Sequence, residues 1–73
     1  MSELPDELQK IAAIAADLGL SADMRVKAME LLGRIGSREA LLVLLELVAN
    51  EKLVAEERDA ALRQARVIIR SGR

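Results

Sequence analysis

Apolar and polar positions alternate along the chain with the period of an α-helix in four successive segments. In the first segment, apolar residues recur every three or four positions, at Leu8, Ile11, Ala15 and Leu18. This spacing places them on one face of a helix, and the other segments repeat it. The four predicted helices span residues 5–18, 22–35, 37–50 and 55–71. The pattern therefore predicts an all-α protein whose four helices form two antiparallel helical hairpins.

Residues that begin and end helices mark the boundaries of these segments. Pro5 stands at the first turn of the first helix, where a missing N–H costs nothing. Ser21 and Ser37 are expected to cap the second and third helices by accepting hydrogen bonds from free backbone amides. Gly19 and Gly36 are expected to end the first two helices in the left-handed conformation. The stretch "LLGRIGSREA" is thus a helix–turn–helix junction.

Gly33 lies inside the second predicted helix and not at its end. A glycine in a helix interior costs up to about 1 kcal/mol relative to alanine. We therefore expect Gly33 to serve packing, by allowing a neighbouring helix to come close.

The chain contains an internal repeat with a period of 33 residues. Sliding residues 4–36 onto residues 37–69 aligns identical residues without a gap. The aligned pairs are Leu8/Leu41, Ala16/Ala49, Leu20/Leu53, Ala22/Ala55, Arg25/Arg58, Ala28/Ala61 and Ile35/Ile68. A repeat of this length predicts two copies of one helical hairpin within a single domain, residues 1–73.

The segment "RVKAMELLGRIGSREALLVLLELV" resembles a HEAT-like repeat of the PBS-lyase type. The resemblance rests on Arg25, Ala28, the pairs Leu32-Gly33 and Ile35-Gly36, and Ala40 with the leucines that follow it. It implies a fragment of a HEAT-like α-α superhelix, although the helical pattern alone also allows a small helical bundle. It further implies a protein-binding scaffold without catalytic residues. The second unit departs from the family at Glu57 and at Ala65-Arg66, so we expect the fourth helix to be a solvent-facing cap.

Arg25 and Arg58 occupy the same position in the two units, near the apolar side of each helix. In a stack of repeats, each is expected to pair with an acidic residue of the neighbouring hairpin. Their predicted role is structural.

Composition argues against catalysis. The 73 residues include no Cys, His, Phe, Tyr or Trp, and the net charge is −1. The commonest acid–base residue and the usual transition-metal ligands are therefore missing, and we predict no enzyme, cofactor, metal or small-molecule substrate. The longest apolar run, "ALLVLLELVA", is too short to span a bilayer. No leader sequence opens the chain, so a soluble, cytoplasmic protein is expected.

The third predicted helix is apolar around most of its circumference, roughly 260°. A four-helix protein of this size can cover one broad face of such a helix but seldom nearly all of it. Either the other three helices surround it in a compact monomer, or one flank contacts another molecule, most simply in a twofold homodimer, which is the arrangement we expect. The sequence offers two alternative flanks, Leu42, Leu45 and Ala49, or Val43 and Leu47.

Arginines recur along one side of the fourth predicted helix. We call this set, which comprises Arg63, Arg66, Arg70 and Arg73, the arginine strip. Their spacing keeps them within an arc of about 80°. The strip is a candidate surface for an acidic protein partner or a phosphate backbone, but the same pattern is typical of a solvated helix end. With no aromatic neighbours, it offers no stacking platform for single-stranded nucleic acid.

Two alternatives to a protein-interaction module follow from the same residues. Residues 5–18 and 22–35 have the spacing of a DNA-binding helix-turn-helix, with the second helix reading the major groove. Arg25 stands where that motif requires a buried apolar residue, and the proposed recognition helix has a mixed charge, so nucleic acid is disfavoured. The other alternative is an engineered or truncated helical scaffold with no biological partner. The start of the chain is expected to be a true N-terminus.

Overall fold

The computed structural model describes residues 5–71, which form four α-helices in succession. These are α1 (Asp6–Ala15), α2 (Ala22–Ile35), α3 (Arg38–Val48) and α4 (Ala55–Ser71). The described residues contain no strand, so the predicted all-α fold is confirmed. The start of the first repeat unit, at residue 4, lies outside the described residues.

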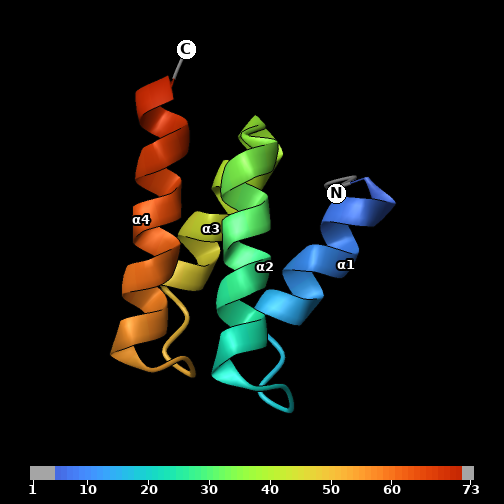
Figure 1. The fold of residues 1–73 in the computed structure, drawn as a ribbon, viewed down its shortest axis with the longest axis vertical. Coiled ribbons are helices and arrows are strands. Elements are labelled where there is room, and N and C mark those ends of the chain that lie inside the picture. The colour runs from blue at the N-terminus through green and yellow to red at the C-terminus, as the bar shows by residue number, and fades with distance from the viewer. Residues whose placement is uncertain (1–4, 72–73) are drawn as a thin grey trace.

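The four helices form two hairpins, and α2 lies at the centre of the arrangement. Helix α2 packs against α1, α3 and α4, and α3 also contacts both α1 and α4. Helices α1 and α4 do not touch each other. Figure 1 shows α4, α2 and α1 side by side, with α3 behind them. The contacts between the hairpins are therefore those of α2 with α4 and α3, and of α1 with α3.

The turn within the first hairpin and the junction between the two hairpins have the capping residues that the sequence predicts. Ser21 Oγ accepts a hydrogen bond from the Met24 amide at 3.2 Å and begins α2. Ser37 Oγ accepts from the Ala40 amide at 3.0 Å and begins α3. Between them, Gly36 ends α2 with φ 67°, in the left-handed region that favours glycine.

Helix α1 ends earlier than predicted, at Ala15 instead of Leu18. The Asp17 side chain causes this, because its Oδ1 accepts a hydrogen bond from the Gly19 amide at 2.8 Å and so closes a turn. The expectation that Gly19 ends the helix in the left-handed conformation is wrong, since Gly36 is the only described residue with positive φ. Leu18 consequently lies outside the helix and is exposed, instead of joining the apolar face.

Helix α3 also ends earlier than predicted, at Val48 instead of Asn50. Asn50 Oδ1 accepts from the Lys52 amide at 2.9 Å, which is the same kind of turn that Asp17 makes. Asp17 and Asn50 stand 33 residues apart. The two hairpins are thus closed by equivalent side-chain hydrogen bonds at equivalent positions.

The core is built from small residues packed around a few large ones. Met29, Leu32, Leu44 and Leu53 are fully buried. Among the described residues, six of the fourteen buried apolar side chains are alanine. Alanine allows close approach of the helices but buries little area, so the core is thin, and several larger apolar residues stay outside it.

Candidate interaction surfaces

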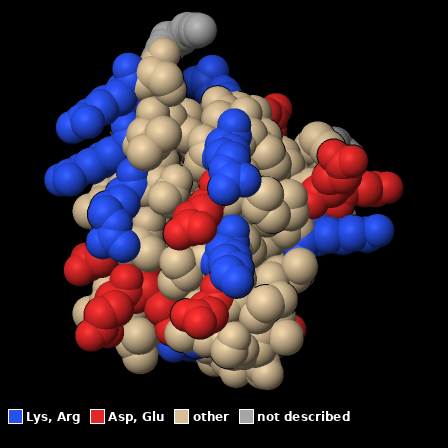
Figure 2. All heavy atoms as spheres, viewed as in Figure 1, with Lys and Arg blue, Asp and Glu red and all other residues tan. Residues whose placement is uncertain are grey.

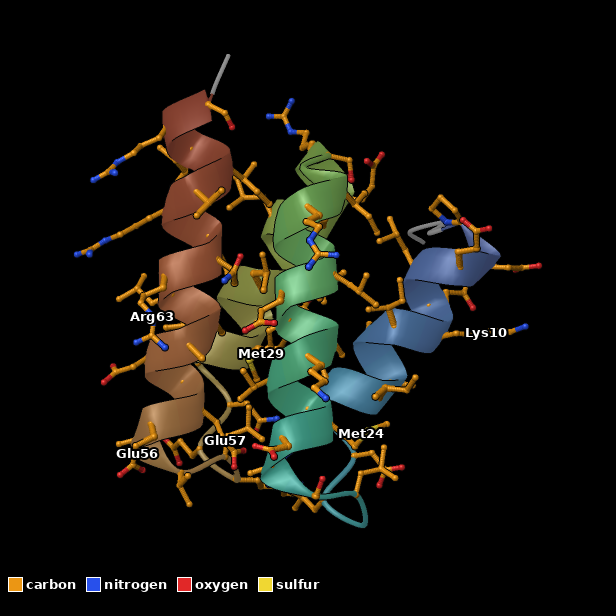
Figure 3. The ribbon with its side chains drawn as sticks, in the orientation of Figure 1. Lys10, Met24, Met29, Glu56, Glu57 and Arg63 are labelled. Carbon is orange, nitrogen blue, oxygen red and sulfur yellow. The ribbon has the colours of Figure 1, made fainter. Side chains whose placement is uncertain are left out.

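Arg25 and Glu57 form a buried ion pair between the two hairpins. Arg25 on α2 donates from Nε to Glu57 Oε1 at 2.9 Å and from Nη2 to Oε2 at 2.8 Å. Figure 3 shows Glu57 on α4, between that helix and α2. This bidentate geometry is the strongest form of the arginine–carboxylate pair. The prediction that Arg25 pairs with an acid of the neighbouring hairpin is confirmed.

The pair also holds the turn between α1 and α2. The remaining Arg25 nitrogen, Nη1, donates to the carbonyl oxygens of Asp17 at 3.1 Å and Leu20 at 2.6 Å. One guanidinium therefore joins the α1–α2 turn, α2 and α4. Every nitrogen of this side chain has a partner, as a buried cation requires.

Both members of the pair are held in their charged forms. Hydrogen bonding to Glu57 raises the pKa of Arg25; burial opposes this, and the negative charges of Glu57 and Asp17 raise it further. Hydrogen bonding to Arg25 lowers the pKa of Glu57, burial opposes it, and the positive charge of Arg25 lowers it further. A carboxylate held in this way is a poor proton donor or acceptor near neutral pH. The pair is therefore suited to holding the hairpins together.

The sequence indicated that Arg25 has an acidic partner, but it did not identify Glu57 as that partner. Glu57 is the acid that stands at an otherwise apolar position of the second unit, where it breaks the resemblance to the repeat family. The structure gives the physical reason, because that position faces Arg25. An acid at an apolar position of one unit, with an arginine on the apolar side of the other, is the signal that could have found the pair.

Gly33 lies where α2 packs tightly against α4. It is buried, and a Cβ atom added to it would overlap with the Gln64 side chain of α4. The Cβ atom of Gln64 lies 3.2 Å from that added atom, so the two backbones are close as well as the side-chain tip. The prediction that Gly33 admits a neighbouring helix is confirmed.

Arg58 does not behave like Arg25. Its side chain is half-buried, yet it makes no ion pair or side-chain hydrogen bond with any residue in the described range 5–71. The predicted ion pair at Arg58 is therefore not formed within residues 5–71, since no acidic side chain of the first hairpin lies against Arg58.

Helix α3 has one buried and one exposed flank. Val43 and Leu47 are buried, and the small part of each that stays accessible lines a groove beside α1. Leu42 is 54% exposed, Leu45 is 42% exposed, and Ala49 is exposed beside them. We call these three residues the α3 flank. Of the two alternatives that the sequence left open, this is the more exposed flank.

The arginine strip lies on the outer side of α4. Arg63, Arg66 and Arg70 are exposed, and Arg73 lies outside the described residues. Figure 3 shows Arg63 pointing away from the other helices. In Figure 2, basic side chains gather over the C-terminal half of α4 and acidic ones over its N-terminal half. The charges follow the helix dipole, which favours acids at the N-terminus and cations at the C-terminus.

The side of α2 that faces away from α4 carries exposed apolar residues. Apolar positions of α2 continue one stripe at helical spacing, at Met24, Ala28, Leu31, Leu32 and Ile35. Met24, Leu31 and Ile35 are nevertheless exposed. Figure 3 places Met24 on the side of α2 nearest α1. Within this stripe, Ala28 and Leu32 are buried where α2 packs against its neighbours, and the other three residues are exposed.

An open groove of about 340 Å³ runs between α1 and α3. Four apolar residues line it, together with Glu46 and Asn50. The apolar members are Ala12, Ala16, Val43 and Leu47. Glu46 is the one titratable side chain in this lining, so the groove has no converging set of groups for acid–base chemistry.

In residues 5–71, no three acidic residues come together in a way that could hold a metal ion. None of the four described helices combines the length and hydropathy needed to cross a membrane.

Comparison with models of protein families, with curated proteins and with solved structures finds no match to this chain.

Proposed function

We propose that this chain is a non-enzymatic protein-interaction module, built from two HEAT-like helical hairpins, that self-associates as a homodimer. The observation that carries the proposal is the α3 flank. Its two leucines are about half exposed on a helix whose opposite side, at Val43, Leu44 and Leu47, forms the core. Exposed leucines at adjacent turns of one helix give a dimer a continuous apolar surface to bury.

The HEAT-like part of the proposal is supported by equivalent features in the two hairpins. The turns at Asp17 and Asn50 use the same side-chain hydrogen bond, 33 residues apart. The hairpins also pack through α2 with α4 and α1 with α3, so that corresponding helices are neighbours. Two hairpins are fewer than the three repeats that a stable solenoid normally needs, and self-association would compensate for the missing third.

The proposed function is non-enzymatic, and the pairing of the two buried charged side chains supports this part of the proposal. The strongly interacting pair, Arg25 and Glu57, is fully used in joining the hairpins. The DNA-binding alternative gains no support, because α2 packs against three helices and its exposed charges alternate in sign. Those charges are Asp23, Lys27, Glu30 and Arg34. A cytoplasmic location stays a prediction.

The decisive experiment measures the absolute mass in solution by light scattering after size exclusion, over about a hundredfold range of concentration. We expect twice the chain mass of 8.0 kDa for the natural sequence and the single mass for Leu42→Glu/Leu45→Glu. The matched control is Val54→Glu/Val67→Glu, which places the same charges at two exposed apolar positions outside the α3 flank. A monomeric natural chain, or an unchanged mass for the Leu42→Glu/Leu45→Glu variant, contradicts the proposal.

A further inference from the structure

The side of α4 that faces away from α2 carries two arginines and two exposed apolar residues. Glu57 and Gln64 face α2, where they meet Arg25 and Gly33. At 3.6 residues per turn, Asp59, Arg70 and Arg63 lie about 200° to 240° around the helix from Glu57. A separate side of α4 lies between about 100° and 180° in the same direction. We call this surface the end face. It consists of Arg58, Leu62, Arg66 and Ile69.

The end face has the properties of an uncovered interface. Leu62 is 38% exposed and Ile69 is 61% exposed. Arg66 is exposed, and the half-buried Arg58 has no ion-pair partner in the described part of the chain. Arg58 therefore carries a charge that no side chain of residues 5–71 pairs with, on a face that also exposes two apolar residues. A carboxylate brought to Arg58 would supply what is missing.

The internal interface shows how a helix would lie on this face. In the 33-residue repeat, Arg58 of α4 is equivalent to Arg25 of α2, and Arg66 is equivalent to Gly33. In the interface between α2 and α4, Arg25 contacts Glu57 and Gly33 lies against Gln64. Glu57 and Gln64 are seven positions apart on α4. A helix packed on α4 in the same way would therefore present two residues, seven positions apart, to Arg58 and Arg66.

We propose that the end face binds an amphipathic helix of a partner protein that carries two acidic residues seven positions apart. The acids pair with Arg58 and Arg66, and small apolar residues between them cover Leu62 and Ile69. This inference rests on the proposed function, since it identifies the kind of partner that such a module takes.

A second copy of this chain does not fit the end face. The residues of α2 equivalent to Glu57 and Gln64 are Met24 and Leu31, so a copy stacked head to tail brings no carboxylate to either arginine. A twofold pairing of end faces instead brings the arginines of both copies together, and like charges repel. The charges therefore favour a partner of different sequence here, whereas the uncharged α3 flank can pair with itself.

The test is a fluorescence-anisotropy titration of the whole protein with a labelled helical peptide. The probe is an alanine-rich peptide of about 17 residues, with two Glu seven positions apart on one face and Gln on the other. The control peptide has Gln in place of both Glu. We expect the diacid peptide to bind at least about tenfold more tightly than the control, because two charge-assisted hydrogen bonds are made.

Variants of the protein locate the binding. Arg58→Gln/Arg66→Gln is expected to abolish the preference for the diacid peptide. Arg63→Gln/Arg70→Gln removes the same charge from the same helix outside the end face, and should keep the preference. As a rescue, Arg66→Glu should prefer a peptide in which one Glu is replaced by Lys. Arg66 is exposed, so this variant does not depend on repacking.

Three results would overturn the inference. These are no preference for the diacid peptide, an equal loss in both double-glutamine variants, or tighter binding of a short DNA duplex to the same face. Self-association is judged separately, by the mass of Leu42→Glu/Leu45→Glu. A dimer with no preference for the diacid peptide keeps the proposed function and rejects this inference.

Discussion

Arg25 and Glu57, separated by 32 residues in the chain, form a two-point ion pair across the interface of the hairpins. Because Arg25 also binds the carbonyl oxygens of Asp17 and Leu20, the pair links three parts of the fold. The thin, alanine-rich core supplies less apolar burial than larger side chains would. The relative position of the hairpins therefore depends strongly on this one polar contact.

Removing the charge of Glu57 should destabilise the protein more than removing that of its neighbour. In Glu57→Gln, the Arg25 guanidinium stays buried without its counterion. We expect the melting temperature to fall by at least about 10 °C, followed by circular dichroism. Glu56→Gln is the matched control on the same turn of α4, where the side chain is exposed, and we expect a change of no more than about 4 °C. Equal changes in the two variants would show that the buried pair does not hold the hairpins together.

Acid should weaken the fold through Glu57. Because the folded state lowers the pKa of this carboxyl, its contribution is fully present above the ordinary value of 4.5. The contribution is lost as the pH falls through the lower pKa of the folded state. We expect the free energy of unfolding, measured by urea titration, to decline with acid more steeply in the natural chain than in Glu57→Gln. Parallel curves for the two proteins would contradict the assignment.

The helices and their junctions could be predicted from the sequence because local rules determine them. Serine caps, the glycine at position 36 and the 3.6-residue period act within a few residues, and α2 and α4 span the predicted ranges. The ends of α1 and α3 were missed because Asp17 and Asn50 bond to the backbone two residues ahead. Such residues compete with the helix, and their position alone does not show which interaction prevails.

The exposed surfaces were harder to predict because they depend on which helices pack together. A helical period shows that Val43 and Leu45 lie on different sides of α3, but not which side meets the core. The same limit explains Leu31 and Ile35, which continue an apolar stripe in sequence yet lie beyond the edge of the contact. Arg25 was recognised as structural, whereas its partner required knowledge of the α2–α4 register.

The close approach at Gly33 predicts coupling with Gln64. Gly33→Ala gains helix propensity, worth up to about 1 kcal/mol, but its new Cβ atom must displace the Gln64 side chain. In a Gln64→Ala background, the side-chain atoms beyond Cβ are gone and only the 3.2 Å contact with Cβ stays, so the gain should appear more fully. We therefore expect Gly33→Ala to be more favourable in that background than in the natural chain. Urea titration of the four proteins in a double-mutant cycle measures the difference, and additive effects would contradict the close approach.

The outer side of α4 should tolerate loss of its charges. Arg63, Arg66 and Arg70 are exposed and make no ion pair with any described residue. Glutamine at all three positions keeps the helix propensity. The one expected loss is the interaction of Arg70 with the C-terminal end of the helix dipole. We expect unchanged helix content by circular dichroism and a fall in melting temperature of no more than about 5 °C. A fall of more than about twice that size would mean that these side chains stabilise the fold through contacts that α4 does not show, and the exposed side of the helix would then have to be reassigned.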